Sequence, residues 1–400
     1  MDMPVSHSIS ASLAENKPLA SWAAVASVGI GAFALVTTEF LPVGLLPLIA
    51  ADLGISEGTA GLMVTIPGFL AALAAPMTLG FAARFDRKRV LVALLMLLVI
   101  SNAIVAVAQG FPALMFGRVL LGVAVGGFWT IGGSLGPRLR PGAEGPRATA
   151  LIFSGVSLGT VAGVPAGALI GDLFGWRTAF LLVSGVALLV VAALQFLLPS
   201  IRAQRGSGLK QIPEVLRLRR VRVGLTAAVL IFVGQFAAYT YITPFLIGAT
   251  GINTGTLSAV LLGYGAAGFA GNLFGGWAAG RNFVLALAGT AFLIALSIVG
   301  LLLAGSSTLV AIAWVAVWGF GFGMLPIAMQ TFLFSSASDR LESIAALFVS
   351  IAQLAIGLGA LVGGFAVDGF GVPSALWLGA ASAMLTAGLI ASTSRQGDKR

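Results

Sequence analysis

The chain has 400 residues, of which 58% are hydrophobic and only 9% are charged. Soluble domains carry about 25% charged residues, so this composition excludes an ordinary soluble protein and predicts an integral membrane protein. The sequence contains no cysteine, which excludes disulfides, thiol nucleophiles and cysteine-based metal sites. Its single histidine, His7, precedes the first apolar run, so a histidine relay or histidine metal site inside the membrane is excluded as well.

Apolar runs of about 18 or more residues predict transmembrane helices where short polar or Pro/Gly-rich breaks separate them. The first 21 residues lack the basic segment and short apolar core of a signal peptide, so we expect the first run to be retained as a span. Twelve runs follow one another along the chain, at residues 22–46, 58–82, 90–109, 113–135, 148–171, 178–198, 223–247, 257–279, 283–304, 307–333, 343–367 and 374–393.

The basic residues predict the orientation of these spans, because lysine and arginine in short loops stay on the cytoplasmic side. Of the 22 basic residues, all but Arg118 and Arg177 lie in the terminal segments or in loops that follow even-numbered spans. We therefore expect both termini to be cytoplasmic. The net charge of +9 follows from this bias. Binding of anionic lipid by residues 202–222 is an alternative explanation, and no nucleic-acid partner is expected.

The sequence repeats itself at a shift of 196 residues. Duplication of this kind predicts an all-α membrane protein whose twelve transmembrane helices form two pseudo-symmetric six-helix bundles, with a site between them near the midplane. The expected units are a tail (1–21), a first bundle (22–198), a basic linker (199–222), a second bundle (223–393) and a tail (394–400). Six identities support the repeat, and they pair Gly163, Gly167, Asp172, Phe174, Gly175 and Ala179 with Gly359, Gly363, Asp368, Phe370, Gly371 and Ala375.

Glu39 and Arg118 are the charged residues that fall well inside predicted spans. A charge at the centre of a bilayer is costly, so such residues usually face a cavity or one another. Glu39 comes late in a span that runs outward and Arg118 early in a span that runs inward, which places both in the outer half of the membrane. We expect the two side chains to pair. Glu39 is then the candidate proton carrier if the pair opens during a transport cycle, whereas a static structural pair is the alternative.

The segment GFAARFDRKRVL, from Gly80 to Leu91, resembles the loop motif of the major facilitator superfamily. In that family a glycine permits close packing and the charges latch the cytoplasmic face. The acidic residue usually found four positions after the glycine is replaced by Arg84, and an acid stands at Asp86 instead. The resemblance implies a latch made by Gly80, Asp86, Arg87, Lys88 and Arg89, while a purely topological role of these charges remains the alternative.

Two further segments resemble motifs of the same superfamily. LMFGRVLLGVAVGGFW, from Leu114 to Trp129, is similar to the arginine motif of its proton-coupled members, and GVSLGTVAGVPAGALIG, from Gly155 to Gly171, is similar to the motif of its drug:proton antiporters. The second segment forms a smooth face that either packs inside one bundle or rocks against the other. That face consists of Gly155, Gly159, Gly163 and Gly167, and Pro165 lacks the N–H that a regular helix would use.

The stretches TTEFLPVGLLPLIAADLGISEGTAG and GWRTAF also resemble the family's exporters of purine ribonucleosides, sugars and chloramphenicol. The resemblance implies proton-coupled efflux of a small polar or amphipathic solute, with a purine ribonucleoside favoured and the drugs or sugars as alternatives. A gradient-independent facilitator is a weaker alternative. We expect no cofactor other than the proton gradient as energy source, because no GxxxxGK loop is present. The resemblance also implies a location in the bacterial inner membrane. We expect no enzymatic activity, and a monomer whose partners are the solute, protons and lipid.

Polar and aromatic residues in the spans are the candidates for solute recognition. The shift of 196 residues places Gln235 where the first half has Glu39, which suggests proton chemistry in one half and neutral recognition in the other. The candidates are Trp129, Gln235, Tyr239, Tyr241, Asn272, Gln330 and Gln353, and Trp318 is a further ring able to stack on the solute, although packing is an alternative role for both tryptophans.

Overall fold

The computed structural model describes residues 20–82, 85–132, 135–141, 144–201, 212–304, 307–335 and 341–397. Arg84, most of the N-terminal tail and most of the basic linker lie outside these described residues. The first half forms α2 (Trp22–Leu53), α3 (Glu57–Ala82), α4 (Arg87–Val107), α5 (Phe111–Gly132), α6 (Gly136–Leu139), α7 (Gly145–Leu158), the π-helix η2 (Gly159–Gly163), α8 (Val164–Phe174) and α9 (Trp176–Leu197). The second half forms α10 (Ile212–Arg217), α11 (Arg219–Tyr239), α12 (Ile242–Thr250), α13 (Thr254–Arg281), α14 (Phe283–Ala304), α15 (Thr308–Phe334), α16 (Leu341–Phe370) and α17 (Val372–Gly397).

Twelve membrane-length apolar helices are present among the described residues, which confirms the predicted number of spans. The first span is longer than expected. α2 continues to Leu53 instead of ending near residue 46, because Pro42 and Pro47 lie within the helix and do not end it. A proline inside a membrane helix is tolerated where a neighbouring helix satisfies the carbonyl that the proline leaves free.

Two predicted spans are interrupted, each just before a proline. In the fifth span, α7 and α8 are joined by the π-turn η2, and Pro165 is the second residue of α8. In the seventh, a turn at Thr240 and Tyr241 separates α11 from α12, and Pro244 lies in the first turn of α12. Proline cannot donate to the carbonyl four residues earlier, so the regular helix widens or breaks at that point.

The helix contacts of the first half recur in the second half. The fifth span packs on α2 and α16 packs on α11, through glycines that allow the backbones to approach closely. Gly175 and Gly371, also related by the repeat, adopt positive φ angles of 85° and 82° where one helix gives way to the next. Corresponding contacts lie 196 positions apart, since Gly163 faces Thr37 and Gly167 faces Leu41, as Gly359 faces Val233 and Gly363 faces Ala237.

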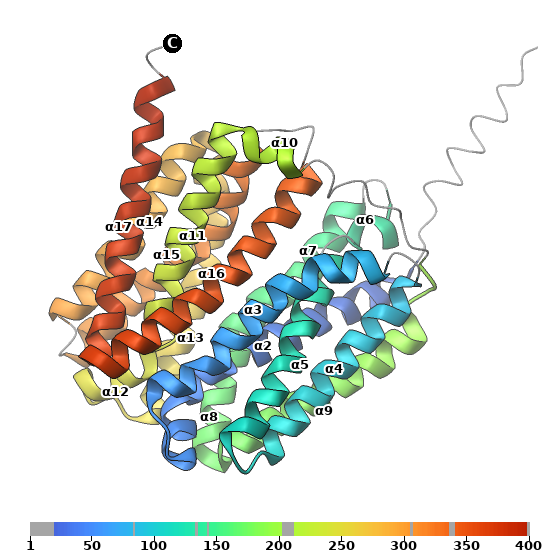
Figure 1. The fold of residues 1–400 in the computed structure, drawn as a ribbon, viewed down its shortest axis with the longest axis horizontal. Helices are drawn as coiled ribbons and strands as arrows, with labels where there is room; N and C mark the ends of the chain where they lie inside the picture. Colours follow the sequence, from blue (N-terminus) through green and yellow to red (C-terminus); the bar gives the residue numbers. More distant parts are fainter. Residues whose placement is uncertain are drawn as a thin grey trace, which may run out of the picture.

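The two groups of helices lie side by side and diverge along their length (Figure 1). We call the end that carries α6 and α10 the linker end, and the end that carries α12 and the last turn of α2 the Asp52 end. At the Asp52 end the halves share an apolar cluster that includes Leu46, Ala60, Tyr241 and Val367. The halves also meet near the middle of the helices, where Gly68 of α3 faces Gly357 of α16 and Phe40 of α2 stacks on Phe236 of α11.

A polar contact also joins the halves at the Asp52 end. The Asp368 carboxylate, in the last turn of α16, accepts hydrogen bonds from the Ser56 hydroxyl at 2.8 Å and from the Gly58 backbone N–H at 3.1 Å. These donors lie at the start of α3, where the partial positive charge of the helix N-terminus favours an anion. We call this group of three residues the Asp368 latch.

Candidate functional site

Glu39 lies on α2 where the two halves meet. Its side chain is buried, with 5% of its surface exposed, and its Oε1 accepts a hydrogen bond of 3.4 Å from Nε2 of Gln353 on α16. The amide oxygen of Gln353 is also buried and has no hydrogen-bond partner among the described residues. An amide can donate or accept, whereas a carboxyl group donates only when protonated. The pair of Glu39 and Gln353 is thus able to form a hydrogen bond in either protonation state of the acid.

Arg118 lies on α5 and is fully buried, and its guanidinium binds backbone carbonyls of two other helices. Its Nε donates to the carbonyl of Met63 at 2.7 Å, and its two terminal nitrogens donate to the carbonyls of Thr38 at 2.9 Å and Glu39 at 3.1 Å. These three bonds tie α5 to α2 and α3. They fix the backbone of α2 at the residue that carries the buried acid.

Two prolines explain why these carbonyls accept from Arg118. Pro42 comes four residues after Thr38, and Pro67 comes four residues after Met63. Each carbonyl would normally accept the N–H four residues later, and proline has none. A buried carbonyl without a partner is costly. Arg118 therefore replaces the two helical hydrogen bonds that the prolines remove, and the carbonyl dipoles stabilise its charge.

This geometry differs from the side-chain pair expected from the sequence. No ion pair joins the side chains of Glu39 and Arg118, whereas among the described residues Arg140 pairs with Glu144 and Arg177 with Asp52. Arg118 instead reaches Glu39 through the backbone carbonyl of that residue. Since the sequence does not reveal which carbonyls are free at a given depth, an acid was the natural partner to expect. The carboxylate is left available to the other half of the protein.

Arg177, the basic residue outside the expected loops, has a local role at the Asp52 end. Its guanidinium pairs with Asp52 at 2.7 Å and donates to the carbonyl of Ala108 at 2.9 Å. It also lies 4.2 Å from the ring centroid of Trp176, in a cation–π contact. These contacts link α2, the end of α4 and α9, so this arginine holds the helices of the first half together.

Gln235, on α11, connects two aromatic rings of the second half. Its side chain is fully buried, its Nε2 donates to the Tyr264 hydroxyl at 2.9 Å, and its Oε1 accepts from Nε1 of Trp318 at 2.8 Å. Tyr239, also a candidate, stacks on Tyr264 with ring centroids 4.8 Å apart. The structure thus brings together Gln235, Tyr239 and Trp318, and adds Tyr264, which the sequence did not single out.

The other candidate residues for the solute lie elsewhere. Tyr241 donates from its hydroxyl to the carbonyl of Ala360 at 2.9 Å and fills the apolar cluster at the Asp52 end. Trp129 contacts rings of its own half, among them Phe153 at 5.6 Å between centroids. Asn272 on α13 and Gln330 on α15 are partly buried. The geometry favours packing roles for Tyr241 and Trp129.

The glycine face of the fifth span packs inside the first half. A Cβ on Gly155 would overlap the backbone of Gly29 on α2, and Gly159 faces Val36 of the same helix. Contact with the other half uses a different face, where Val161 lies against Gly265 of α13. Of the two alternatives, the structure favours packing on α2 for the glycine face.

Asp86 lies at the linker end and caps α4. Its carboxylate accepts from the backbone N–H of Lys88 at 2.9 Å and of Arg89 at 3.3 Å, and from the hydroxyl of Ser200 beyond α9. Burial opposes its ionisation, but these hydrogen bonds outweigh burial and hold the pKa of Asp86 below its ordinary value. Arg87 is buried and its backbone N–H donates to the carbonyl of Ile201. Asp86 thus connects α4 to the segment after α9, and both lie in the first half. Gly80, the glycine of the same motif, lies in the last turn of α3.

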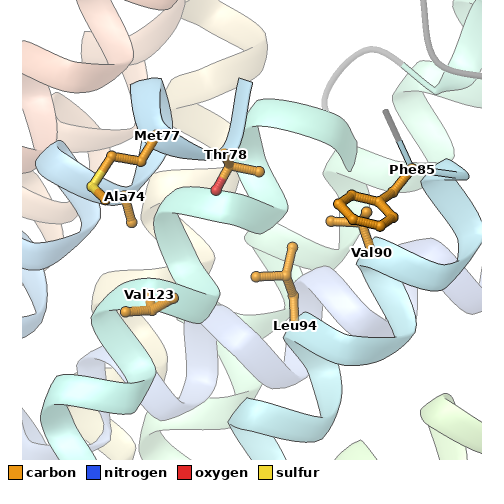
Figure 2. Close-up of a pocket in the computed structure, with 7 residues that line it drawn as sticks. All are labelled: Ala74, Met77, Thr78, Phe85, Val90, Leu94 and Val123. Carbon is orange, nitrogen blue, oxygen red and sulfur yellow. The ribbon is translucent and has the colours of Figure 1, made fainter. Parts of the chain in front are cut away.

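A hollow of about 290 Å³ opens between α3, α4 and α5 near the linker end (Figure 2). Its walls are almost entirely apolar, and none of the candidate site residues lines it. It offers no charged or amide group for recognition of a polar solute. The lining residues are Ala74, Met77, Thr78, Phe85, Val90, Leu94 and Val123.

Several residues of the site were missed from the sequence. Met63 and Thr38 contribute only backbone atoms, so their side chains give no signal. Tyr264 was overlooked in the glycine-rich segment LLGYGAAGF, although it is one of only three tyrosines in the chain. Asp368 appeared only as a repeat identity with Asp172. The spacing of four between each freed carbonyl and its proline was the signal that could have revealed the Arg118 contacts.

The sequence and the fold are similar to those of known transporters. The chain is 37% identical over 375 residues to the purine ribonucleoside efflux pump NepI of Salmonella paratyphi A, with 94% of each chain covered. It is 37% identical over 370 residues to the protein of the same name from Escherichia coli O6:K15:H31, covering 92% of this chain and 93% of that one.

Two solved structures of a bacterial homologue of the human lysosomal transporter Spinster share the fold. The inward-facing, occupied structure has a TM-score of 0.77 at 16% identity, covering 95% of this chain and 97% of that one. The inward-facing, unoccupied structure has a TM-score of 0.71 at 19% identity, covering 94% and 95%. The profile of the Major Facilitator Superfamily matches residues 28–359. With its twelve spans, this chain belongs to the Major Facilitator Superfamily and is a multi-pass transport protein of the bacterial inner membrane.

Proposed function

We propose that this protein exports a small neutral solute of the purine ribonucleoside class in exchange for protons, by alternating access of the site between its two halves. The observation that carries the proposal is the position of Glu39. Its buried carboxylate lies where the halves meet and binds Gln353 of the opposite half. A proton that arrives at or leaves this carboxylate changes the contact between the halves directly.

The coupling follows from the cost of burying a charge. An ionised carboxylate is strongly disfavoured in an apolar junction, whereas a neutral carboxyl group that forms a hydrogen bond is tolerated. Protonation of Glu39 therefore favours closure of the Asp52 end around it. Opening of the linker end gives the acid access to water, where it loses the proton. Arg118 keeps the backbone of Glu39 in place during both steps.

The substrate class is supported by the relatives and by the chemistry of the second half. Proteins that are 36% to 37% identical over nearly the whole chain carry the name purine ribonucleoside efflux pump. In the second half, the partly exposed ring of Phe322 and the neutral amide of Gln353 suit an uncharged planar solute. Gln235, Tyr239, Tyr264 and Trp318 are buried against one another and support the ring.

The test uses purified protein in proteoliposomes with an imposed pH gradient. We expect uphill movement of inosine, a purine ribonucleoside, that stops when a protonophore collapses the gradient. Inosine flux that ignores the gradient would contradict proton coupling and indicate a facilitator or channel. A panel that adds chloramphenicol and hexoses tests the substrate class, since gradient-driven flux of those probes without inosine flux would contradict it.

We further propose that the linker end faces the cytoplasm. Most of the basic residues that the structure describes, among them Arg89, Arg140 and Arg222, lie in the segments at this end, as the positive-inside rule requires of a cytoplasmic face. Because the chain has no cysteine, single cysteines can be introduced without background. A cysteine at Ser200 should be labelled by a membrane-impermeant maleimide only after the membrane is permeabilised, and one at Asp172 should be labelled in intact cells. The reverse pattern would overturn the orientation.

A further inference from the structure

A continuous set of aromatic rings runs from Gln235 to the junction between the halves. Tyr264 stacks on Phe322 with centroids 6.2 Å apart, and Phe322 meets the ring of Phe236 edge-on at 6.1 Å. Phe236 in turn stacks on Phe40 of α2, at 5.4 Å and an angle of 20°. The ring set therefore begins in the core of the second half and ends beside Glu39 in the first half.

Gln235 controls the buried part of this set. Both ends of its amide are occupied, by Tyr264 and by Trp318, so neither end is free to bind a solute directly. A fully buried amide with two partners of good geometry holds them in one orientation, because breaking either bond leaves an unpaired polar group in an apolar core. Trp318 meets Tyr264 edge-on at 5.9 Å, which closes a rigid triangle of the three side chains.

The outer members of the set are the ones able to meet a solute. Phe40 and Phe322 are partly exposed, whereas Phe236 and Tyr264 behind them are buried. Their π faces can stack on a flat ring whatever polar substituents it carries, because stacking uses the face of the solute ring and the substituents lie at its edge. The nearby Glu39 and Gln353 supply the hydrogen-bonding groups that such faces lack.

We propose that Phe322 provides the stacking face for the planar ring of the exported solute, that Phe40 flanks this ring at a steep angle to Phe322, and that Gln235 is the positioning residue that sets the face through Tyr264 and Trp318. The inference rests on the proposed function for its substrate class, a solute that carries a purine-like ring. Gln235 then affects the affinity for the solute without touching it, because it acts through the rings that it holds.

The experiment measures the Kd of radiolabelled inosine for the detergent-purified full-length protein by equilibrium dialysis, with no pH gradient. Gln235→Met keeps the volume but removes both hydrogen bonds, and we expect it to raise Kd about tenfold. Phe322→Leu should raise Kd to a similar extent, while Phe322→Tyr, which keeps the ring face, should restore wild-type binding. In proteoliposomes the same variants should raise KM and leave kcat within about twofold.

Thr290→Val is the matched control. Thr290 is buried in the same half and donates to Ala286 of its own helix, so its loss removes a buried hydrogen bond that involves none of the rings. Should Gln235→Met fail to fold, the pair Phe322→Leu and Phe322→Tyr carries the test alone. Wild-type Kd in both Gln235→Met and Phe322→Leu would overturn the inference, and so would a wild-type protein that binds no inosine at about 1 mM.

Failure of the proposed function gives a different result. If the variants shift Kd as expected but wild-type flux ignores the pH gradient, proton coupling is refuted while the stacking face stands. If flux is coupled to protons but Kd does not respond to the ring variants, the stacking face is refuted while the proposed function stands.

Discussion

Arg118 offers a direct test of the idea that one side chain replaces two helical hydrogen bonds removed by prolines. Arg118→Met leaves the carbonyls of Thr38 and Met63 buried without donors. Each buried unsatisfied carbonyl costs about 1 to 3 kcal/mol, although interhelical hydrogen bonds in membranes average only about 0.6 kcal/mol. Removing the buried cation recovers part of the loss. We expect the free energy of unfolding to fall by about 2 to 4 kcal/mol.

The proline supplies the other side of a double-mutant cycle. Pro42→Ala restores an N–H that can donate to the carbonyl of Thr38. In this background Arg118→Met therefore leaves one carbonyl without a donor instead of two. The two substitutions should therefore be non-additive, with the double variant about 1 kcal/mol more stable than the sum of the single effects predicts. Any straightening of α2 caused by Pro42→Ala cancels in the cycle.

The assay is equilibrium unfolding of the four proteins in mixed micelles of dodecyl maltoside and SDS, followed by tryptophan fluorescence. Pro47→Ala is the control, because Pro47 also lies in α2 and its freed carbonyl, that of Val43, is not one of the three that bind Arg118. Additivity of Arg118→Met and Pro42→Ala within about 0.5 kcal/mol would refute the reasoning. Equal coupling to Pro47→Ala would refute it as well.

Three further predictions test the contacts that hold the protein in this state. Asp368→Asn weakens the latch at the Asp52 end, so electron–electron resonance between spin labels on the two halves should show more of the open form there. The exposed repeat counterpart Asp172→Asn is the control, and an unchanged distance distribution would speak against a latch. Gly155→Ala forces a Cβ against the backbone of α2 and should lower the thermal midpoint by several degrees, whereas Gly185→Ala, with open space around it, should not; equal shifts would contradict the packing role. Folding lowers the pKa of Asp86, so its stabilising effect is present above the ordinary carboxyl pKa and is lost as pH falls through the lowered value. The difference in thermal midpoint between wild type and Asp86→Ala should shrink in acid, and a difference that grows in acid would exclude this role.

The fold could be predicted closely because hydropathy reports span length directly. Twelve apolar runs and a repeat at 196 residues were enough to expect two related bundles, and Gly163 and Gly359 make equivalent contacts in the two halves. The errors lie at prolines. Pro165 and Pro244 change the backbone locally without any loss of hydrophobicity, so hydropathy alone does not mark the π-turn or the break after α11.

The site was only partly predictable from the sequence. A charge in an apolar run is conspicuous, which is why Glu39 and Arg118 were identified. Their partners depend on which helices are neighbours and on their relative rotation, and no local pattern reveals either. Gln235 was found through the repeat, but its hydrogen bonds to Trp318 and Tyr264 depend on tertiary packing, which the sequence does not show. Side-chain chemistry thus identifies candidates, while backbone acceptors and ring contacts appear only once the helices are packed.

The central claim is that Glu39 carries the proton, and the most direct measurement compares two modes of transport in Glu39→Gln. Proteoliposomes report inosine exchange at equal pH on both sides and inosine accumulation driven by a pH gradient. We predict that the variant retains exchange and loses gradient-driven accumulation, because glutamine binds Gln353 but cannot gain or lose a proton. Glu144→Gln, which changes a surface acid paired with Arg140, should keep both modes. Full gradient-driven accumulation by Glu39→Gln would contradict the account.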